Sequence, residues 1–174
     1  PPLIHAQHEA RRLRQRLVRV ANFDPDADRT VLLQGATRGS LENAFSTVAL
    51  ARQEDLRRLG PARTLFLFFF TGHGLQGRIL LEDGPVTTAE LGSMIKRVGA
   101  DFTVGAFDAC YAGSLDPDTL HEKGVGENPG LDLFRELAEE VLTAEGSVWF
   151  VSSGAGQASY EDERLGGGFT HYFI

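Results

Sequence analysis

The fold of this chain is decided by residues 64–74, which read TLFLFFFTGHG. Between Thr64 and Phe70 nearly every position is apolar, and the run does not alternate between apolar and polar side chains. Such a run is typical of a strand that is buried on both faces, as in a parallel sheet covered by helices. Two later runs share this pattern, and we predict further buried strands from Phe102 to Asp108 and from Ser147 to Ser153.

The segments between these runs predict helices, turns and a short strand. Capping residues and apolar spacing mark four helices: residues 8–20, Leu41 to about Leu59 with Ser40 as its N-cap, Thr87 to about Val98 with a Thr87–Glu90 capping box, and Leu131 to Leu142. We also expect a strand over Thr30–Leu33, a hairpin over Arg78–Val86 that turns at Asp83-Gly84, and a flexible loop over residues 114–130. Because strands and helices alternate, the sequence predicts an α/β fold with a mostly parallel central sheet and helices on both faces.

The composition limits the classes of protein that this chain can belong to. It has 174 residues, of which 42% are hydrophobic and 24% charged, and we expect one globular domain. The longest apolar run is far shorter than the about 20 residues that span a bilayer, and the first residues resemble no secretory signal. The single cysteine excludes an internal disulfide, so we expect a reducing, cytoplasmic location. The net charge of -7 argues against nucleic acid as the main partner, and we predict no membrane partner.

The charge is spread unevenly along the chain. Residues 1–20 hold five arginines and one glutamate, whereas residues 116–145 hold nine acids and two bases. Leu13, Leu17 and Val20 lie at helical spacing among the arginines, so we interpret the arginines as the solvated face of a helix. A basic interaction patch is the alternative.

One histidine and the only cysteine lie close to the carboxyl ends of buried strands. His73 stands between two glycines after the run that ends at Phe70, and Cys110 follows the run that ends at Asp108. Ligands bind at the carboxyl ends of strands in α/β sheets, and neighbouring strands are about 4.8 Å apart, so both side chains can reach one substrate carbonyl. A thiolate is a nucleophile, an imidazole can protonate a leaving amine, and the backbone N–H groups of Gly74 and Cys110 are candidates to hold an oxyanion. Either residue alone is more often structural, but their equivalent positions favour a catalytic site.

Around these positions the chain resembles a known family. The stretches Phe69–Gly74 and Phe107–Ser114 are similar to the histidine and cysteine motifs of caspase-like cysteine peptidases, especially the bacterial metacaspase-like and orthocaspase-like proteins. Residues 36–38 resemble the segment before that family's second helix, and residues 166–170 resemble its Gly-Phe-Thr stretch. The resemblance implies a caspase-like three-layer sandwich. Residues 1–113 would be its large-subunit-like part, residues 114–130 its linker and residues 131–174 the start of its small-subunit-like part.

The resemblance also implies an activity. Cys110 would attack a peptide carbonyl to form a thioester, and His73 would protonate the departing amine and then help to activate water. The sequence calls for no cofactor and shows no metal ligand set. Calcium is left open as an activator, although no compact calcium-binding loop is present.

The predicted substrate preference rests on Asp108, which stands where metacaspase-like enzymes line the pocket for the residue before the scissile bond. A buried carboxylate needs a cation or hydrogen-bond donors, so we predict protein or peptide substrates with Arg or Lys at that position. Thr71 matches a small hydroxyl position of the same pocket, Ser152 is a further candidate, and Glu161 and Asp162 are weaker ones. The alternative is that Asp108 only caps local backbone.

The sequence leaves several alternatives open for how the activity of this chain would be regulated. Lys123 is the only Lys or Arg in the loop 114–130, so self-cleavage there would follow Lys123; an unprocessed loop is the alternative. Tyr111 and Ala109 differ from the residues that are common in metacaspases. Residues 80–84 and 87–91 also resemble caspase-like proteases that are fused to helical repeats and activated by a regulatory partner or attached domain. A catalytically silent signalling scaffold is the third alternative.

Overall fold

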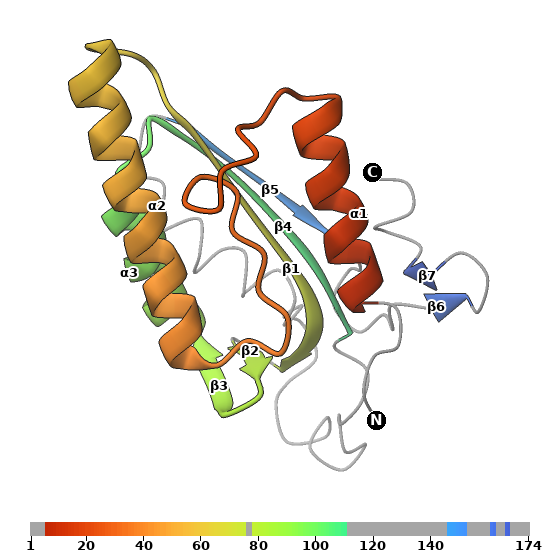
Figure 1. Ribbon diagram of the computed structural model, residues 1–174. Coiled ribbons are helices and arrows are strands. Elements are labelled where there is room, and N and C mark those ends of the chain that lie inside the picture. The colour runs from red at the N-terminus through yellow and green to blue at the C-terminus, as the bar shows by residue number, and fades with distance from the viewer. Residues whose placement is uncertain (1–5, 76–77, 111–145, 153–160, 163–165, 168–174) are drawn as a thin grey trace.

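The described helices and strands are arranged in three layers. A computed structural model of the chain describes residues 6–75, 78–110, 146–152, 161–162 and 166–167. A central sheet has α2 and α3 against one face and α1 on the other (Figure 1). The helices are α1 (Ala6–Arg19), α2 (Arg38–Leu59) and α3 (Thr88–Val98), and the strands are β1 (Leu65–Leu75), β2 (Arg78–Leu81), β3 (Gly84–Thr87), β4 (Phe102–Cys110), β5 (Ser147–Val151), β6 (Glu161–Asp162) and β7 (Gly166–Gly167).

The central sheet is mixed. Its five strands follow the order β3-β2-β1-β4-β5, and β6 pairs separately with β7. Strands β1, β4 and β5 are parallel, whereas β2 and β3 form an antiparallel hairpin that joins the sheet at Gly74 and Leu75 of β1. The predicted α/β fold is therefore confirmed. The expected mostly parallel sheet is not confirmed, because the predicted hairpin adds its two antiparallel strands to the same sheet.

The core lies between the sheet and the helices α2 and α3. Alternate side chains of a strand share a face, so Phe66, Phe68 and Phe70 of β1 all point toward these helices. The ring centroid of Phe68 lies 5.6 Å from that of Phe45 in α2 and 5.6 Å from that of Phe107 in β4. The aromatic run recognised in the sequence thus supplies one wall of the core. The other buried members of the core cluster are Leu41, Ile79, Val86, Leu91, Met94, Ile95 and Val98.

The start of α2 differs from the prediction. The N-cap is Thr37, not Ser40: the Thr37 hydroxyl accepts from the Ser40 N–H at 3.2 Å, and the Ser40 hydroxyl accepts from the Thr37 N–H at 2.9 Å. The Arg38 N–H, in the first turn, donates to a carboxylate oxygen of Asp83 at 2.9 Å. Helices leave their first N–H groups without intrahelical partners, and Asp83 from the hairpin turn satisfies one of them. The predicted stop at Gly60 is confirmed.

Other local predictions differ in their extent or fall outside the described residues. Thr30–Leu33 runs as loop and not as strand, since a strand needs a backbone neighbour and the described strands offer it none. Strand β1 continues past Phe70 to Leu75, so that His73 lies two residues before the carboxyl end of the strand. The capping box of Thr87 and Glu90 is confirmed. The loop predicted over residues 114–130 and the helix predicted over Leu131–Leu142 lie outside the described residues.

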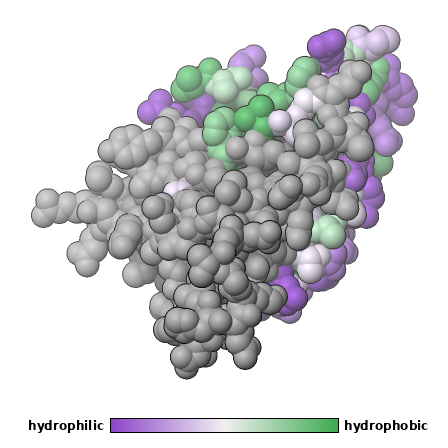
Figure 2. Space-filling view, turned by 180° about the vertical axis from the view of Figure 1, so that it is seen from behind, coloured by the Kyte–Doolittle hydropathy of each residue, from purple (hydrophilic) through white to green (hydrophobic). Residues whose placement is uncertain are grey.

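Apolar side chains also reach the surface of the described part of the sheet. Phe102 of β4 and Val148 and Phe150 of β5 are all exposed. Figure 2 shows, on the molecule seen from behind, hydrophobic residues that gather in one group near the top of the view. None of the described helices is both long enough and apolar enough to cross a membrane.

Loss of the α3 cap is expected to destabilise the fold. In Thr87→Ala the hydroxyl that accepts from the Glu90 N–H at 3.3 Å is lost. We expect the free energy of unfolding, measured by urea titration, to fall by about 1 kcal/mol. Thr87→Ser keeps a hydroxyl and is the matched control. Equal losses in the two variants would show that the cap is not the cause.

Glu90 also predicts an acid-dependent loss of stability. The Arg38 guanidinium lies 2.7 Å from one carboxylate oxygen, and together with the N–H and O–H of Thr87 it lowers the pKa of Glu90 from 4.5 to about 2. Because the folded-state pKa is the lower one, the ionised carboxylate stabilises the fold above pH 4.5, and this contribution disappears as the pH falls toward about 2. The stability advantage of the wild type over Glu90→Gln should therefore shrink across this window in urea titrations. An advantage that does not change with pH would contradict the prediction.

Candidate functional site

The last rung of the β1–β4 ladder joins His73 and Cys110. The two strands run parallel in one register from Leu65 opposite Phe102 to His73 opposite Cys110. Neighbouring strands of a sheet lie about 4.8 Å apart, so the backbones of these two residues are direct neighbours at the carboxyl ends of their strands. The tertiary structure thus brings together the two residues that the sequence predicted to be catalytic.

A second row of predicted site residues crosses three parallel strands. Thr71 is in register with Asp108, two residues before His73 and Cys110 respectively. Val151 is in register with Phe107, and the Ser152 N–H donates to the Phe107 carbonyl at 3.0 Å, so Ser152 lies beside Asp108. Thr71, Asp108 and Ser152 therefore form a row that lies next to the His73–Cys110 rung.

This row lies on the face of the sheet that carries α1. Phe107 points into the core beneath α2 and α3, and the alternation of the strand turns Asp108 to the opposite face. Asp108 is only 6% exposed. His73 is half-buried and lines the end of a cavity, which we call the edge groove; it is bordered by α1, by α2, by the loop of residues 20–37 and by the edge of β1. The His73 side chain is therefore at an opening and not sealed in the core.

Glu9 is a residue of this site that the sequence reasoning missed. It is the one acidic residue of α1, it is 3% exposed, and its carboxylate accepts from the Thr71 hydroxyl at 3.4 Å. From the sequence, Glu9 was noted only as the single acid among the five arginines of residues 1–20. The sequence did contain an indication that Glu9 is buried. Glu9, Leu13 and Leu17 are four residues apart, so they lie on the same face of the helix. Two buried carboxylates, of Glu9 and Asp108, thus flank Thr71.

The remaining predicted residues are placed only in part. Gly74 is buried where β1 passes from pairing with β4 to pairing with β2, and the assignment of its N–H and that of Cys110 to an oxyanion site stays a prediction. Glu161 and Asp162 form β6, whose partner β7 lies near α1. Lys123 lies outside the described residues. In the part of the chain that the structure describes, no three His, Cys, Asp or Glu residues come together in a group that could hold a metal ion.

Comparison with known proteins found no match among protein-family models, curated proteins or solved structures. The resemblance to caspase-like peptidases therefore rests on the residues of this chain alone.

The site requires a glycine between Thr71 and His73. A Cβ atom on Gly72 would lie 2.7 Å from the tip of the Phe70 ring, which packs against Phe107 with ring centroids 6.3 Å apart. We expect Gly72→Ala to lower the free energy of unfolding by about 1–3 kcal/mol, measured by urea titration, because the ring must move within a packed core.

Gly39→Ala is the matched control, since a Cβ there meets no atom within 4 Å and alanine favours the helix. It should leave the stability unchanged or raise it. A loss in Gly72→Ala no larger than in this control would contradict the prediction.

Proposed function

We propose that this chain is a caspase-like cysteine endopeptidase that cleaves after Arg or Lys. The observation that carries the proposal is the rung of His73 and Cys110 at the carboxyl ends of two adjacent parallel strands. Peptide hydrolysis by a cysteine needs a nucleophile and a proton donor that reach the same carbonyl group. In α/β sheets, substrates bind at the carboxyl ends of the strands, and this pair of residues lies there. The resemblance of the surrounding residues to the two caspase-like motifs agrees with the register.

The proposed reaction divides peptide hydrolysis into two steps. The Cys110 thiolate attacks the carbonyl carbon, and the carbonyl electron pair moves to oxygen, where the N–H groups of Gly74 and Cys110 hold the oxyanion. Collapse of this intermediate breaks the C–N bond, and His73 gives a proton to the departing amine and leaves a thioester. Water, deprotonated with the help of His73, then attacks the thioester and releases the carboxylate product and the thiol.

The proposed preference for basic residues rests on two buried carboxylates. Glu9 and Asp108 are 3% and 6% exposed, and Thr71 lies between them. Carboxylates on either side of Thr71 would attract a cationic side chain of a substrate. The guanidinium of a substrate arginine can donate to two carboxylate oxygens at once, and a lysine ammonium supplies the same charge. Ser152, at the far end of the row, would add a hydroxyl.

Several properties implied by the resemblance belong to the same proposal. These are self-processing after Lys123 and activation by calcium or by a regulatory partner. The single cysteine adds a cytoplasmic location to the proposal. A catalytically silent scaffold is the competing function, and the experiment below separates it from an active enzyme.

The test uses fluorogenic peptides with Arg, Lys, Asp or Ala before the scissile bond, with and without calcium. We expect turnover of the Arg and Lys peptides only, and a decrease of kcat/KM by about 10³-fold or more in Cys110→Ala and in His73→Ala. Asp108→Asn should lower kcat/KM for the Arg peptide by about 30-fold, which corresponds to about 2 kcal/mol of lost charge pairing. The same variant should label as fast as the wild type with uncharged iodoacetamide at Cys110.

Two outcomes would remove the proposal. Turnover that survives Cys110→Ala would exclude Cys110 as the nucleophile. No turnover of any peptide, together with no labelling of Cys110 by an arginine chloromethylketone, would favour the scaffold.

A further inference from the structure

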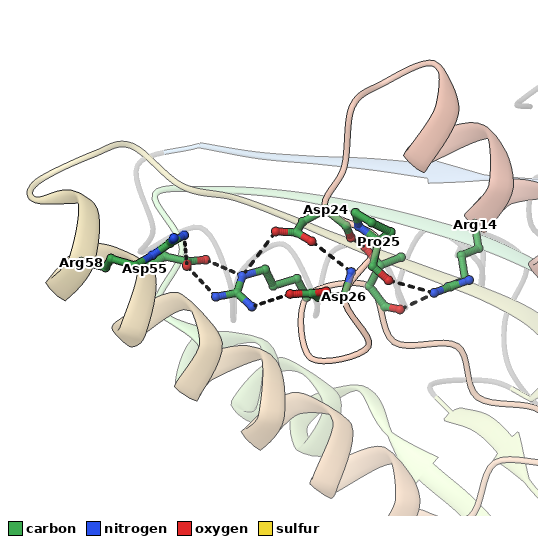
Figure 3. A network of polar contacts seen from close by, with 8 residues as sticks. Arg14, Asp24, Pro25, Asp26, Asp55 and Arg58 are labelled. Carbon is green, nitrogen blue, oxygen red and sulfur yellow. Dashed lines mark hydrogen bonds and ion pairs between the residues drawn. The ribbon is translucent and has the colours of Figure 1, made fainter.

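The arginines of α1 lie on two flanks of the helix, and those on the first flank hold the neighbouring loop. Arg14 donates to the Pro25 carbonyl at 3.1 Å and to the Thr30 carbonyl at 3.3 Å (Figure 3). Arg11 donates to the side-chain carbonyl of Gln34 at 2.7 Å. Both arginines therefore fix the loop between α1 and α2 and have a structural role.

Arg12, Arg16 and Arg19 lie on the opposite flank of α1. At about 100° per residue, they fall within about 60° of one another and about 150° from Arg14 around the helix axis. Arg16 and Arg19 are exposed, Arg12 is half-buried, and the three border a hollow of about 250 Å³. Within the part of the chain that the structure describes, their guanidinium groups form no ion pair and no hydrogen bond. We call these three residues the arginine face.

Acidic side chains of α1 do not balance the charge of the arginine face. Glu9 is the only acid of the helix, and it is buried beside Thr71. The three arginines span about 10 Å along the helix axis, so their like charges raise the positive potential at this surface. A ligand with several carboxylates would lower this repulsion and gain a charge-assisted hydrogen bond at each guanidinium. The arginine face therefore fits an acidic polypeptide segment.

The arginine face begins one helical turn away from the candidate site. Glu9, which accepts from the Thr71 hydroxyl at 3.4 Å, precedes Arg12 by three residues. At a rise of about 1.5 Å per residue, the face extends from about 5 to about 15 Å beyond Glu9 along α1. An extended peptide advances about 3.3 Å per residue. A substrate whose basic residue lies between Glu9 and Asp108 can therefore bring acids a few positions away to the arginine face.

The sequence around Lys123 carries the charges that the arginine face requires. Residues 114–130 hold four acids and one lysine. Asp116 and Asp118 stand seven and five residues before Lys123, and Glu127 stands four residues after it. Lys123 is also the residue after which self-cleavage is proposed. A basic residue before a scissile bond and acids at this spacing thus occur together in the chain itself.

We propose that the arginine face binds residues 114–130 of a second copy of this chain through their carboxylates and so presents Lys123 to Cys110. The inference rests on the proposed function, because that function supplies the cleavage after Lys123. Its new element is the arginine face, which would select substrates by acids that lie outside the pocket for the basic residue.

The length of the chain favours a second copy over the same copy. A bound segment that is extended from Asp116 to Lys123 is about 23 Å long at about 3.3 Å per residue. Only six residue steps, or about 20 Å, lead from Cys110 to Asp116. A chain that starts at Cys110 therefore has no residues left for the turn that would return its own Lys123 to Cys110.

The first test measures binding without cleavage, in the Cys110→Ala chain. A fluorescein-labelled peptide with the sequence of residues 114–130 is titrated with this chain, and fluorescence anisotropy gives Kd. We expect the combined substitution Arg12→Gln, Arg16→Gln and Arg19→Gln to raise Kd about tenfold, because three exposed charge pairs are lost.

Two controls separate the arginine face from the net charge of the chain. The combined substitution Arg57→Gln, Arg63→Gln and Arg97→Gln removes the same charge from exposed arginines outside α1 and should leave Kd within about twofold. A peptide with Asn in place of Asp116 and Asp118 should bind the chain about fivefold more weakly, because two of its carboxylates are lost.

The second test measures cleavage of one copy by another. The full Cys110→Ala chain is the substrate, and the wild type or the variant without the arginine face is the enzyme. We expect the variant to cut the chain about tenfold more slowly, while its kcat/KM for a short fluorogenic lysine peptide stays within about twofold of the wild type. If the wild type turns over no short peptide, the proposed function fails, whereas the binding measured in the Cys110→Ala chain does not depend on turnover.

Four outcomes would overturn the inference. The first is equal Kd values for the peptides with and without Asp116 and Asp118, and the second is an equal rise of Kd in the two arginine variants. The third is processing whose rate per chain does not change with concentration, because the same copy would then supply the segment. The fourth is binding of the chain to phosphatidylserine vesicles through the arginine face with no binding of the peptide, which would assign this face to a membrane surface.

Discussion

The parallel pairing of β1 with β4 in a single register is the constraint on which the rest of this structure depends. Side chains of a strand alternate between the two faces of the sheet, so a register shift of one residue would move every side chain to the opposite face. In the observed register Phe68 and Phe70 enter the core beneath α2 and α3, while Thr71 and His73 face the side of α1. Burial of the phenylalanines therefore also fixes which face of the sheet receives the residues of the candidate site.

The same register alone places two rows of candidate site residues side by side. His73 and Cys110 form the last rung, and Thr71, Asp108 and Ser152 form the row beside it. These residues come from segments that lie far apart in the sequence, and the ladder brings their backbones to neighbouring positions. One edge of β1 pairs with β4 at the candidate site, and the other edge borders a groove that ends at His73.

Features that depend on residues close together in the sequence were predicted correctly, whereas features that depend on distant segments were not. The Thr87–Glu90 capping box and the stop at Gly60 involve residues close in sequence, and both are present as predicted. Helix α2 begins at Arg38 with Thr37 as its N-cap and not Ser40, and Asp83, more than forty residues later, accepts a hydrogen bond from the Arg38 N–H. Thr30–Leu33 has the residues of a strand, but strand pairing depends on a neighbouring backbone that its own sequence cannot supply.

The sequence by itself indicated which apolar runs form the three parallel strands, where the α3 cap lies, and that a histidine and a cysteine stand near the carboxyl ends of two of these strands. These features depend on the spacing of apolar residues and on contacts between residues close in sequence. Both can be recognised in a single sequence. Only the tertiary structure decided the mixed sheet, the register that sets His73 opposite Cys110, and the burial of Glu9 against Thr71. Each of these joins segments that are distant in the chain, and the free energy of packing them together, not the preference of any one segment, selects the arrangement.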